Sequence, residues 1–336
     1  MEVSAREEIN QIRMERPHVV ILGAGASYAS FPNGDKNGNK LPLMNNLIDI
    51  LNLKDIIKET GLNFKSNNFE DIYAQIHKHD NLEEIKNKIE KRVYEYFSNL
   101  EIHDFPTLYD HLVLSLREKD VIATFNWDPF LIQAYSRNVD KFKLPRILFL
   151  HGNVAAGYCE KDKNAGVVGY KCPKCDNPFS SSKLLYPITE KNYHLDEFIS
   201  VQWEELQEYL EDTFMITIFG YGAPNSDVSA IDLMKSAWGD VNQRNMEQTE
   251  IIDIKDEDVL HDTWQPFIHS HHYETYKSFY DSWIANHPRR TGEAYLNQYI
   301  DAKFINTNPV PVNYNFTELW SWFEQLKSVE DQNNST

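Results

Sequence analysis

Three short apolar runs, each followed at once by polar residues or glycines, constrain the fold of this chain more than any other feature of its sequence. They are residues 18–22, 121–125 and 147–150. Runs of this length fit buried strands and are too short for helices. Continuous apolar runs are typical of parallel strands, and the carboxyl ends of such strands open toward a ligand crevice. We therefore expect the residues that follow the three runs to meet at one edge of a sheet.

The rest of the chain supports this architecture. Two further runs, 214–219 and 249–254, are separated from the others by segments with helical spacing. Alternating strands and helices predict a parallel sheet with right-handed crossovers. We predict an α/β fold, with a Rossmann-like parallel sheet and helices on both of its faces.

The domain organisation that we predict has one core and two insertions. The catalytic domain is expected at 1–262 and a helical C-terminal extension at 263–336. Within the catalytic domain, a helical insertion is expected at about 43–105. A small cysteine-bearing insertion, similar to a zinc ribbon, is expected at about 154–193.

Composition excludes several classes of protein. The 336 residues include 51 acidic and 33 basic side chains, for a net charge of −18. Nonspecific binding to nucleic acids or anionic membranes needs positive charge, so neither is expected. No apolar run approaches the roughly 18 residues that a membrane span needs, and residues 1–15 lack a signal-type apolar segment. We predict a cytoplasmic protein.

Candidate site residues stand at the ends of the three runs. Gly23-x-Gly25 follows the first run, where glycines let the backbone approach a phosphate at a helix N-terminus. The third glycine of the full motif is missing, so a tight structural turn is an equal alternative. Asn126 and Asp128 follow the second run, where strand-end capping is the alternative. His151 follows the third run and could instead be a satisfied core histidine. Their combination favours a site.

Three motifs together resemble the signature motifs of sirtuins, in the right order and over roughly residues 18–260. They are Gly23-Ala-Gly-Ala-Ser27, Thr124-Phe-Asn-Trp-Asp128 and His151-Gly-Asn153. The resemblance implies that Asn126 and Asp128 face the nicotinamide ribose of NAD and that His151 is the base acting on its hydroxyls. It also implies nucleotide contacts from Gly23, Ala24, Gly25, Ala26, Ser27, Gly220, Tyr221 and Asp253.

The departures from the deacylase pattern are equally informative. Where protein deacylases have a Pro-Asp-Phe-Arg stretch, this chain has Phe31-Pro-Asn-Gly-Asp35 and a long polar insertion. A second CxxC pair is missing, and no equivalent of the strand that pairs with an acyl-lysine peptide is evident. The closer resemblance is to bacterial sirtuin-like domains of anti-phage defence proteins, which hydrolyse NAD.

We therefore expect an NAD hydrolase that yields nicotinamide and ADP-ribose, as the toxic effector of an abortive-infection defence system. The chemistry fits the residues: an amide such as Asn126 can hold a water, and His151, with an ordinary pKa near 6.5, can take its proton. One alternative is a protein deacylase or ADP-ribosyltransferase. Another is a nonenzymatic nucleotide-sensing module, against which the pairing of Asn126 and His151 argues.

The three cysteines are Cys159, Cys172 and Cys175. Cys172-Pro-Lys-Cys175 is typical of a zinc knuckle, and structural zinc takes four ligands. Asp162 or His194 could supply the fourth, and a metal-free ribbon is the alternative. The five histidines between His261 and His287 are expected to form a solvated or interface face rather than a metal cluster.

We expect the protein to work as an assembly. Large apolar and aromatic residues are frequent from Trp264 to Tyr299 and near Trp320 and Trp322. Exposed apolar patches usually mark interfaces, so a homo-oligomer is predicted. A companion ATPase or phage-sensing protein is implied by the resemblance alone.

Overall fold

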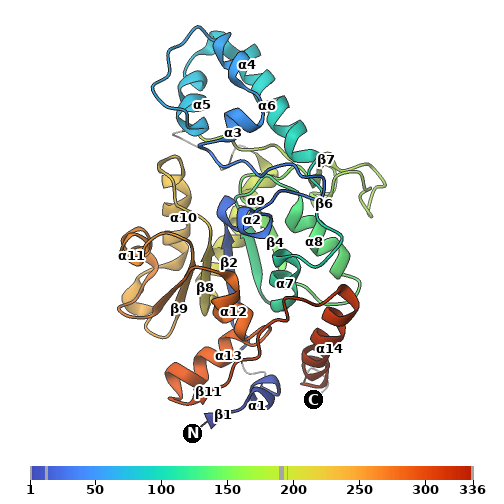
Figure 1. Ribbon diagram of the computed structural model, residues 1–336, viewed down its shortest axis with the longest axis vertical. Helices are drawn as coiled ribbons and strands as arrows, with labels where there is room; N and C mark the ends of the chain where they lie inside the picture. Colours follow the sequence, from blue (N-terminus) through green and yellow to red (C-terminus); the bar gives the residue numbers. More distant parts are fainter. Residues whose placement is uncertain (1, 12–13, 189–192, 195, 334–336) are drawn as a thin grey trace.

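A six-stranded parallel sheet forms the centre of the protein (Figure 1). The structure, a computed structural model, describes residues 2–11, 14–188, 193–194 and 196–333. In chain order the strands are β2 (His18–Leu22), β3 (Val121–Thr124), β4 (Arg146–Phe149), β8 (Met215–Phe219), β9 (Gln248–Ile252) and β10 (Tyr273–Tyr276).

The spatial order of these strands identifies the type of fold. The order across the sheet is β4-β3-β2-β8-β9-β10, and every neighbouring pair is parallel. Numbered along the chain, this is 3-2-1-4-5-6, the order of dinucleotide-binding Rossmann folds. The order reverses between β2 and β8, and open α/β sheets bind ligands outside the carboxyl ends of the strands at such a point. The predicted fold class is confirmed.

Helices cover both faces of the sheet. All five residues of β2 are buried: Val20 and Leu22 belong to one apolar core, and Val19 and Ile21 to the other. The first core includes residues of α7, α8, α12 and α14, and the second includes residues of α9, α10 and α11. This double coverage explains why each strand reads as an unbroken apolar run.

The α-helices are short apart from α6, α9 and α14. Their bounds are α1 (Ala5–Ile9), α2 (Ala24–Ser30), α3 (Leu47–Ile50), α4 (Lys54–Lys58), α5 (Phe69–His77), α6 (Glu83–Ser98), α7 (Leu108–Ser115), α8 (Phe130–Asn138), α9 (Glu197–Asp212), α10 (Val228–Trp238), α11 (Glu257–Trp264), α12 (Trp283–Asn286), α13 (Thr291–Tyr295) and α14 (Phe316–Asn333).

Two modules leave the core, as expected. Helices α3 to α6 form a helical module that stands beyond the carboxyl edge of the sheet (Figure 1). Its apolar residues, among them Phe69, Ile89 and Phe97, join the core on the α7 side of the sheet. The cysteine module is an antiparallel sheet of β5 (Ala156–Cys159), β6 (Asn164–Val167) and β7 (Ser180–Ser181), in the order β6-β5-β7.

The C-terminal extension departs from the sequence-based expectation in one respect. It was expected to be helical, but it contributes β10, which pairs with β9 at the edge of the main sheet. Tyr273 and Tyr276 bound this strand, and aromatic residues favour half-buried strand positions. It also contributes β11 (Phe304–Ile305), which pairs with β1 (Glu2–Val3). The domain boundary near residue 262 stays a prediction.

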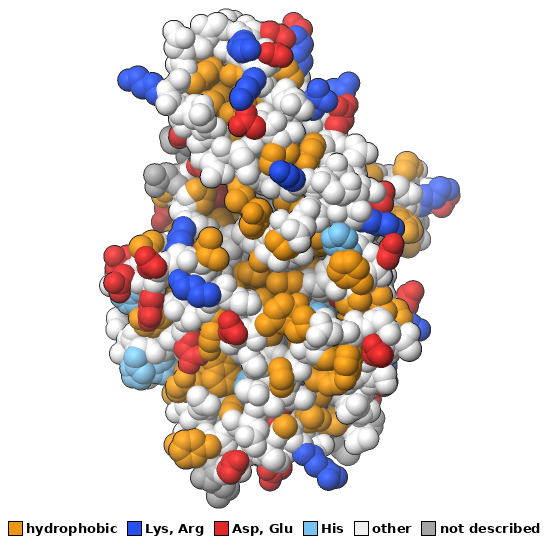
Figure 2. Space-filling view, in the orientation of Figure 1, with side chains coloured by type: hydrophobic (Ala, Val, Ile, Leu, Met, Phe, Trp, Pro, Cys, Tyr) orange, Lys and Arg blue, Asp and Glu red, His pale blue; other side chains and the backbone are white. Residues whose placement is uncertain are grey.

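Charge is spread over the surface. On the face seen in Figure 2, Lys and Arg side chains lie interspersed with Asp and Glu, and apolar side chains lie between them. Within the described residues, no helix has both the length and the apolar character needed to cross a membrane.

Candidate active site at the carboxyl edge of the sheet

A pocket of about 530 Å³ lies at the carboxyl edge of the sheet, between the strand ends and the helical module. It brings together residues that are far apart in the chain and that follow β2, β3, β4, β8 and β9. Ala26, by contrast, is buried in the core below the pocket. The predicted site residues that line the pocket are Gly23, Ala24, Gly25, Ser27, Asn126, Asp128, His151, Gly220, Tyr221 and Asp253.

The two glycine-containing turns pack against each other where the strand order reverses. The Gly25 N–H donates to Gly220 O at 2.9 Å, and a Cβ on Gly25 would lie 2.8 Å from Gly220 Cα. Close approach therefore requires glycine at this position. The N–H groups of Gly23 and Ala26 are also bonded to backbone carbonyls. The structural-turn interpretation accounts for much of this motif, and phosphate binding stays a prediction.

The side-chain amide of Asn126 is fixed in one orientation. Its Nδ2 lies 2.9 Å from Gly23 O and 3.0 Å from Ser27 Oγ. A carbonyl oxygen only accepts hydrogen bonds, so the nitrogen must face Gly23. The amide oxygen therefore points away from the glycine turn. It is the atom with which Asn126 can accept a hydrogen bond from a ligand in the pocket.

A buried network behind Asn126 includes a residue that the sequence did not identify. Tyr109, on α7, places its hydroxyl 2.7 Å from Ser27 Oγ and 3.3 Å from Asn126 Nδ2. Ser27 Oγ in turn donates to Asp128 Oδ2 at 2.6 Å. Burial raises the pKa of Asp128 to about 6, although the hydrogen bond from Ser27 opposes this shift. The carboxyl of Asp128 can thus exist in both protonation states near neutral pH.

Gly152 and Asn153 fix the backbone of the segment that carries His151. Asn153 Nδ2 donates to Asn126 O at 3.1 Å and to Asp128 O at 2.6 Å, so it joins the ends of β3 and β4. Gly152 has φ +73°, and a Cβ there would lie 1.8 Å from Lys183 O. No other residue fits this position without moving the backbone that carries His151.

The imidazole of His151 is enclosed by aromatic rings and a carboxylate. Its ring centroid lies 4.7 Å from that of Phe125, edge to face, and its Nε2 lies 3.3 Å from the Tyr193 hydroxyl. Asp227 Oδ1 is 3.8 Å from the same nitrogen. His151 therefore differs from an ordinary core histidine, since it also lines the pocket. Neither Tyr193 nor Asp227 was predicted from the sequence to belong to the site.

The helical module supplies the opposite wall of the pocket. Leu43, Met44 and Phe97 line it, facing Trp127 from the strand side. Glu70, in the first turn of α5, also reaches the pocket, where its Oε1 accepts from the N–H of Ser226 at 3.2 Å. The wall opposite the strand ends is thus mainly apolar, whereas the ends of β3 and β4 contribute Asn126, Asp128 and His151. Toward β9 the pocket carries charged side chains, with Asp253 and Lys255 among the lining residues.

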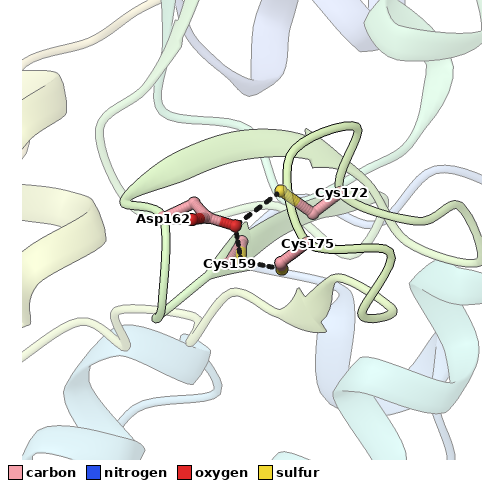
Figure 3. A group of neighbouring side chains, drawn as sticks. All are labelled: Cys159, Asp162, Cys172 and Cys175. Carbon is pink, nitrogen blue, oxygen red and sulfur yellow. Dashed lines mark hydrogen bonds between the residues drawn. The ribbon is translucent and has the colours of Figure 1, made fainter.

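A second group of converging side chains lies in the cysteine module (Figure 3). The ligand atoms of Cys159, Asp162, Cys172 and Cys175 all lie within 4.8 Å of one another. Cys159 Sγ is 3.5 Å from Cys175 Sγ, and Cys172 Sγ is 3.4 Å from Asp162 Oδ2. Hydrogen bonding by the three thiols lowers the pKa of Asp162 below its usual value, with Cys175 contributing most.

These four residues fit a zinc ion. Tetrahedral structural zinc takes four ligands, with Zn–S distances of about 2.3 Å, so neighbouring donor atoms lie roughly 3.5–4 Å apart. Of the two predicted candidates for the fourth ligand, Asp162 belongs to the group and His194 does not. Elsewhere in the described chain no comparable group of metal-ligating side chains occurs, and the cluster at His269, His271 and His272 does not form one.

No protein-family model matches the sequence, and no curated protein matches it. Solved structures that this chain matches include Sir2 proteins. A Sir2 homologue in complex with NAD has 15% identity and a TM-score of 0.35, covering 97% of this chain and 93% of that one. A mutant of a Sir2 homologue in complex with ADP-ribose has 13% identity and a TM-score of 0.41, covering 96% of each chain. The strand order of the sheet defines the type of fold.

Proposed function

We propose that this protein is an NAD hydrolase, which converts NAD and water to nicotinamide and ADP-ribose. The observation that carries the proposal is the pairing of Asn126 and His151 at adjacent strand ends, in one pocket with the glycine turn. The lining residues follow the ends of five neighbouring strands, which favours an extended ligand such as a dinucleotide. The position of the pocket at the reversal of a Rossmann strand order supports a nucleotide ligand.

The reaction breaks the bond between the ribose C1′ and the nicotinamide nitrogen. Because this nitrogen is positively charged in NAD, nicotinamide leaves as a neutral molecule with the bonding electron pair, and no acid is needed to protonate it. The ribose carbon becomes electron-deficient. Water then adds to it and loses one proton. The protein must therefore orient the ribose, hold the water and accept that proton.

The pocket residues match these tasks. The amide oxygen of Asn126 would accept a hydrogen bond from the water, because its nitrogen is held by Gly23 and Ser27. His151 would take the proton from the water or from a ribose hydroxyl, as general base. Asp128 would bind ribose hydroxyls, and its carboxylate form would stabilise the electron-deficient carbon. The apolar wall at Phe97 and Trp127 would receive the nicotinamide ring.

Bound zinc would affect the site indirectly, by stabilising the cysteine module. Ser182, which follows β7, accepts a hydrogen bond from Asn153 N–H at 3.1 Å and donates to Asn153 O at 2.8 Å. The module therefore supports the loop that carries His151. We expect about one zinc per chain by metal analysis, and Cys172→Ser is expected to lose zinc and stability together, because metal binding is coupled to folding. A metal-free protein of full stability would contradict this role.

The decisive test is chromatography of NAD incubated with the purified protein, with and without an acyl-lysine peptide. Release of nicotinamide without the peptide supports hydrolysis, and release only with it indicates the deacylase. Asn126→Ala and His151→Ala are expected to lose activity, the latter by ~10² or more if it is the base. Both should still bind NAD, because the glycine turn is intact. Asn63→Ala and His79→Ala, at exposed positions, are the matched controls.

Two outcomes would redirect the assignment. Full NAD cleavage by Asn126→Ala would show that the site is wrong. Binding of NAD without any cleavage, in the presence of every candidate activator, would favour the nucleotide-sensing alternative.

We further propose that the hydrolase is the toxic effector of a bacterial anti-phage system, which is the role of the proteins that its motifs resemble. An ungated NAD hydrolase would deplete its own cell, so a trigger is expected. Cells that express the protein should lose NAD after phage infection, and cells with His151→Ala should not. The homo-oligomer and a companion ATPase or sensor stay predictions. A monomer at micromolar concentration in light scattering, with and without NAD, would count against an assembly.

A further inference from the structure

We propose that Asp227 is a positioning residue for His151, and that its carboxylate stabilises the imidazolium which forms when His151 accepts a proton. The catalytic meaning of this pair rests on the proposed function. The pair itself is a structural feature, and it can be tested on the resting protein.

The two side chains meet inside the protein. Asp227 and His151 are 4% and 6% exposed, and Asp227 Oδ1 lies 3.8 Å from His151 Nε2. This is an ion-pair distance rather than a hydrogen bond. Catalytic contacts are often long before substrate binds and shorten in the complex. The other carboxylate oxygen, Oδ2, accepts from the Tyr221 hydroxyl at 2.9 Å, which fixes the direction of the carboxylate.

Asp227 directly precedes a helix, but its side chain does not cap that helix. Asp227 ends a 3₁₀ turn (Asn225–Asp227) and directly precedes α10, where aspartate commonly accepts a hydrogen bond from the first helical turn. Here the side chain makes no capping bond and is directed toward Tyr221 and His151 instead. This favours a role for the carboxylate in the pocket.

The buried surroundings of His151 make the Asp227 carboxylate important for the stability of a charged imidazolium. Burial disfavours a charged imidazolium, and a nearby carboxylate offsets that cost. Polar groups close to His151 include Asp227, which directly precedes α10, and the Tyr193 hydroxyl from the segment before α9. Burial, followed by the charge of Asp227, raises the pKa of both Tyr193 and Tyr221, so both phenols stay neutral near pH 7. The remaining ionisable side chains that line the pocket are Glu70, Asp128, Asp253 and Lys255.

The proton balance of the step is simple. Water or a ribose hydroxyl loses one proton to His151, whose imidazole becomes an imidazolium. The Asp227 carboxylate stays ionised throughout and takes no proton. After the product leaves, the imidazolium releases its proton to solvent.

The first experiment is an NMR titration of the histidine side chains of the wild-type protein, with the His151 signal assigned from its absence in His151→Ala. His18 is an internal reference, since it is similarly buried and burial lowers its pKa to about 4. We expect His151 to titrate at a clearly higher pH than His18, because a carboxylate lies beside its imidazole. Titration of His151 near pH 4, alongside His18, would overturn the proposal. This measurement needs neither a variant at Asp227 nor enzymatic activity.

The second experiment is the same titration of Asp227→Asn, with Asp253→Asn as the matched control. Both variants remove one carboxylate from the pocket, but only Asp227 contacts His151. Asp227→Asn is expected to lower the pKa of His151 by about one unit or more, which is the size of effect for a carboxylate within 4–6 Å. Asp253→Asn should change it by less. Equal shifts in the two variants would overturn the proposal.

Activity then separates this proposal from the proposed function. If the wild-type protein cleaves NAD, Asp227→Asn should move the acidic limb of the kcat profile to lower pH by the same amount as the NMR shift. A structural role alone would lower the rate equally at every pH, which would count against the pair. If the wild-type protein cleaves no NAD, the hydrolase proposal fails, while the titrations still decide whether Asp227 stabilises the imidazolium.

Discussion

Two aspartates that flank the central strand β3, one at each end of the sheet, respond to burial in opposite ways. At the carboxyl end, Asp128 is buried without a cation among its hydrogen-bond partners, and burial raises its pKa to about 6. At the amino end, Asp120 is equally buried, but Lys119, Arg117 and His18 outweigh burial and lower its pKa to about 2. The pKa values of two aspartates that flank the same strand, β3, are thus shifted in opposite directions.

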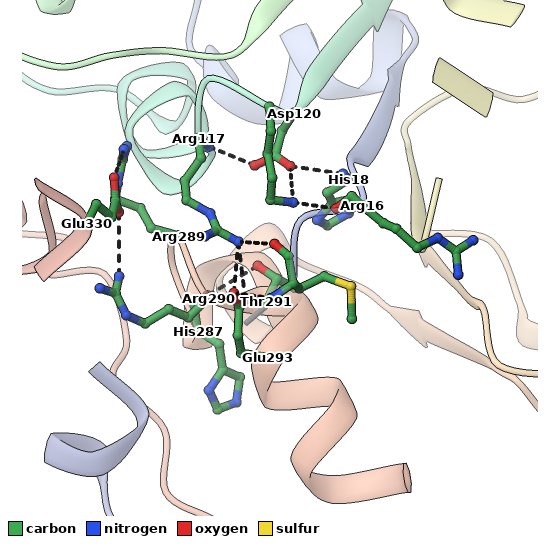
Figure 4. Close-up of polar contacts among 12 residues, drawn as sticks. Arg16, His18, Arg117, Asp120, His287, Arg289, Arg290, Thr291, Glu293 and Glu330 are labelled. Atoms are coloured by element: carbon green, nitrogen blue, oxygen red, sulfur yellow. Dashed lines mark hydrogen bonds and ion pairs between the residues drawn. The ribbon is translucent and has the colours of Figure 1, made fainter. Parts of the chain in front are cut away.

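The amino end continues into a network of paired charges (Figure 4). Arg117 donates to Glu293 at 3.0 Å, and Arg289 donates twice to Glu330 on α14, at 2.6 Å each. Arg290, which is fully buried, lies 3.6 Å from Glu330. The pair of Arg117 and Glu293 joins the C-terminal extension to the core, whereas Arg289 and Arg290 bind α14 to the segment before α13 within the extension. The network therefore serves assembly of the fold.

The difference between the two aspartates indicates which end of the sheet is suited to proton transfer. Compensated buried charges keep their ionised state over the physiological pH range and hold segments together. Asp128, whose burial no cation offsets, instead has a pKa raised toward neutral pH, and perturbed pKa values are common at functional sites. The carboxyl end contains both Asp128 and the pair of His151 and Asp227, whereas the amino end contains ion pairs that join the termini to the sheet.

The largest expected effect on stability comes from breaking the network at the amino end. Glu293→Ala removes the carboxylate that compensates Arg117, and losing one partner of a buried pair costs about 3–5 kcal/mol of unfolding free energy. Chemical denaturation measures this. The control, Glu324→Ala, breaks an exposed pair with Lys327 and should cost about 0.5 kcal/mol or less. Similar losses for the two variants would show that the network is not a special source of stability.

The second-largest expected effect is a gain in the free energy of unfolding from Asp128→Asn, at the carboxyl end of the sheet. Because the pKa of Asp128 is raised from 3.8 to about 6, its contribution is fully present below pH 4 and is lost as the pH rises through 6. Asp128→Asn cannot ionise and should therefore be more stable than wild type at pH 7, by up to about 3 kcal/mol. The difference should vanish below pH 4. Denaturation at several pH values tests this, and a loss of stability at pH 7 would contradict it.

The same substitution at the amino end should have the opposite sign. The pKa of Asp120 is lowered from 3.8 to about 2, so its contribution is present above pH 4 and is lost as the pH falls through 2. Asp120→Asn should lose about 2 kcal/mol at pH 7. The loss should shrink in acid. If Asp120→Asn and Asp128→Asn change stability in the same direction at pH 7, the comparison of the two ends is wrong.

The smallest expected effect on stability is at Tyr109. Tyr109→Phe removes hydrogen bonds to Ser27 and Asn126 and should cost about 1 kcal/mol. NAD cleavage should fall by a larger factor than this stability loss, because the amide of Asn126 is less firmly held. Nicotinamide release and denaturation, measured on the same preparation, compare the two. An unchanged rate would show that Gly23 and Ser27 alone orient the amide.

Several features of the site were predictable because they depend on local sequence. The apolar runs gave the strands, and the polar residues after them reached one edge because parallel strands share a direction. Asn126, Asp128, His151 and the glycine turn were found in this way and line the pocket. The strand β10 was not predicted, since its four residues lack a continuous apolar run and lie between helical segments.

Other features depended on residues that approach one another only after folding. Tyr109 lies in the first turn of the buried helix α7, and its sequence position gives no indication that its hydroxyl reaches Asn126. Asp227 follows a glycine-containing turn and could have been a simple helix cap. The choice of Asp162 over His194 at the cysteine group was likewise made by the antiparallel turn that brings Asp162 to Cys172.

The sequence by itself therefore determined the type of sheet and the candidate residues at its carboxyl edge, because burial on both faces and strand direction are encoded in short runs of residues. Tertiary structure alone decided which carboxylate faces His151, which hydroxyl supports Asn126 and which acids are buried. The first two properties depend on side chains that are tens of residues apart in the sequence. The cations that offset the burial of Asp120 are mainly its chain neighbours, Lys119 and Arg117. Burial and the sign of the neighbouring charge then gave Asp128 and Asp120 opposite pKa shifts.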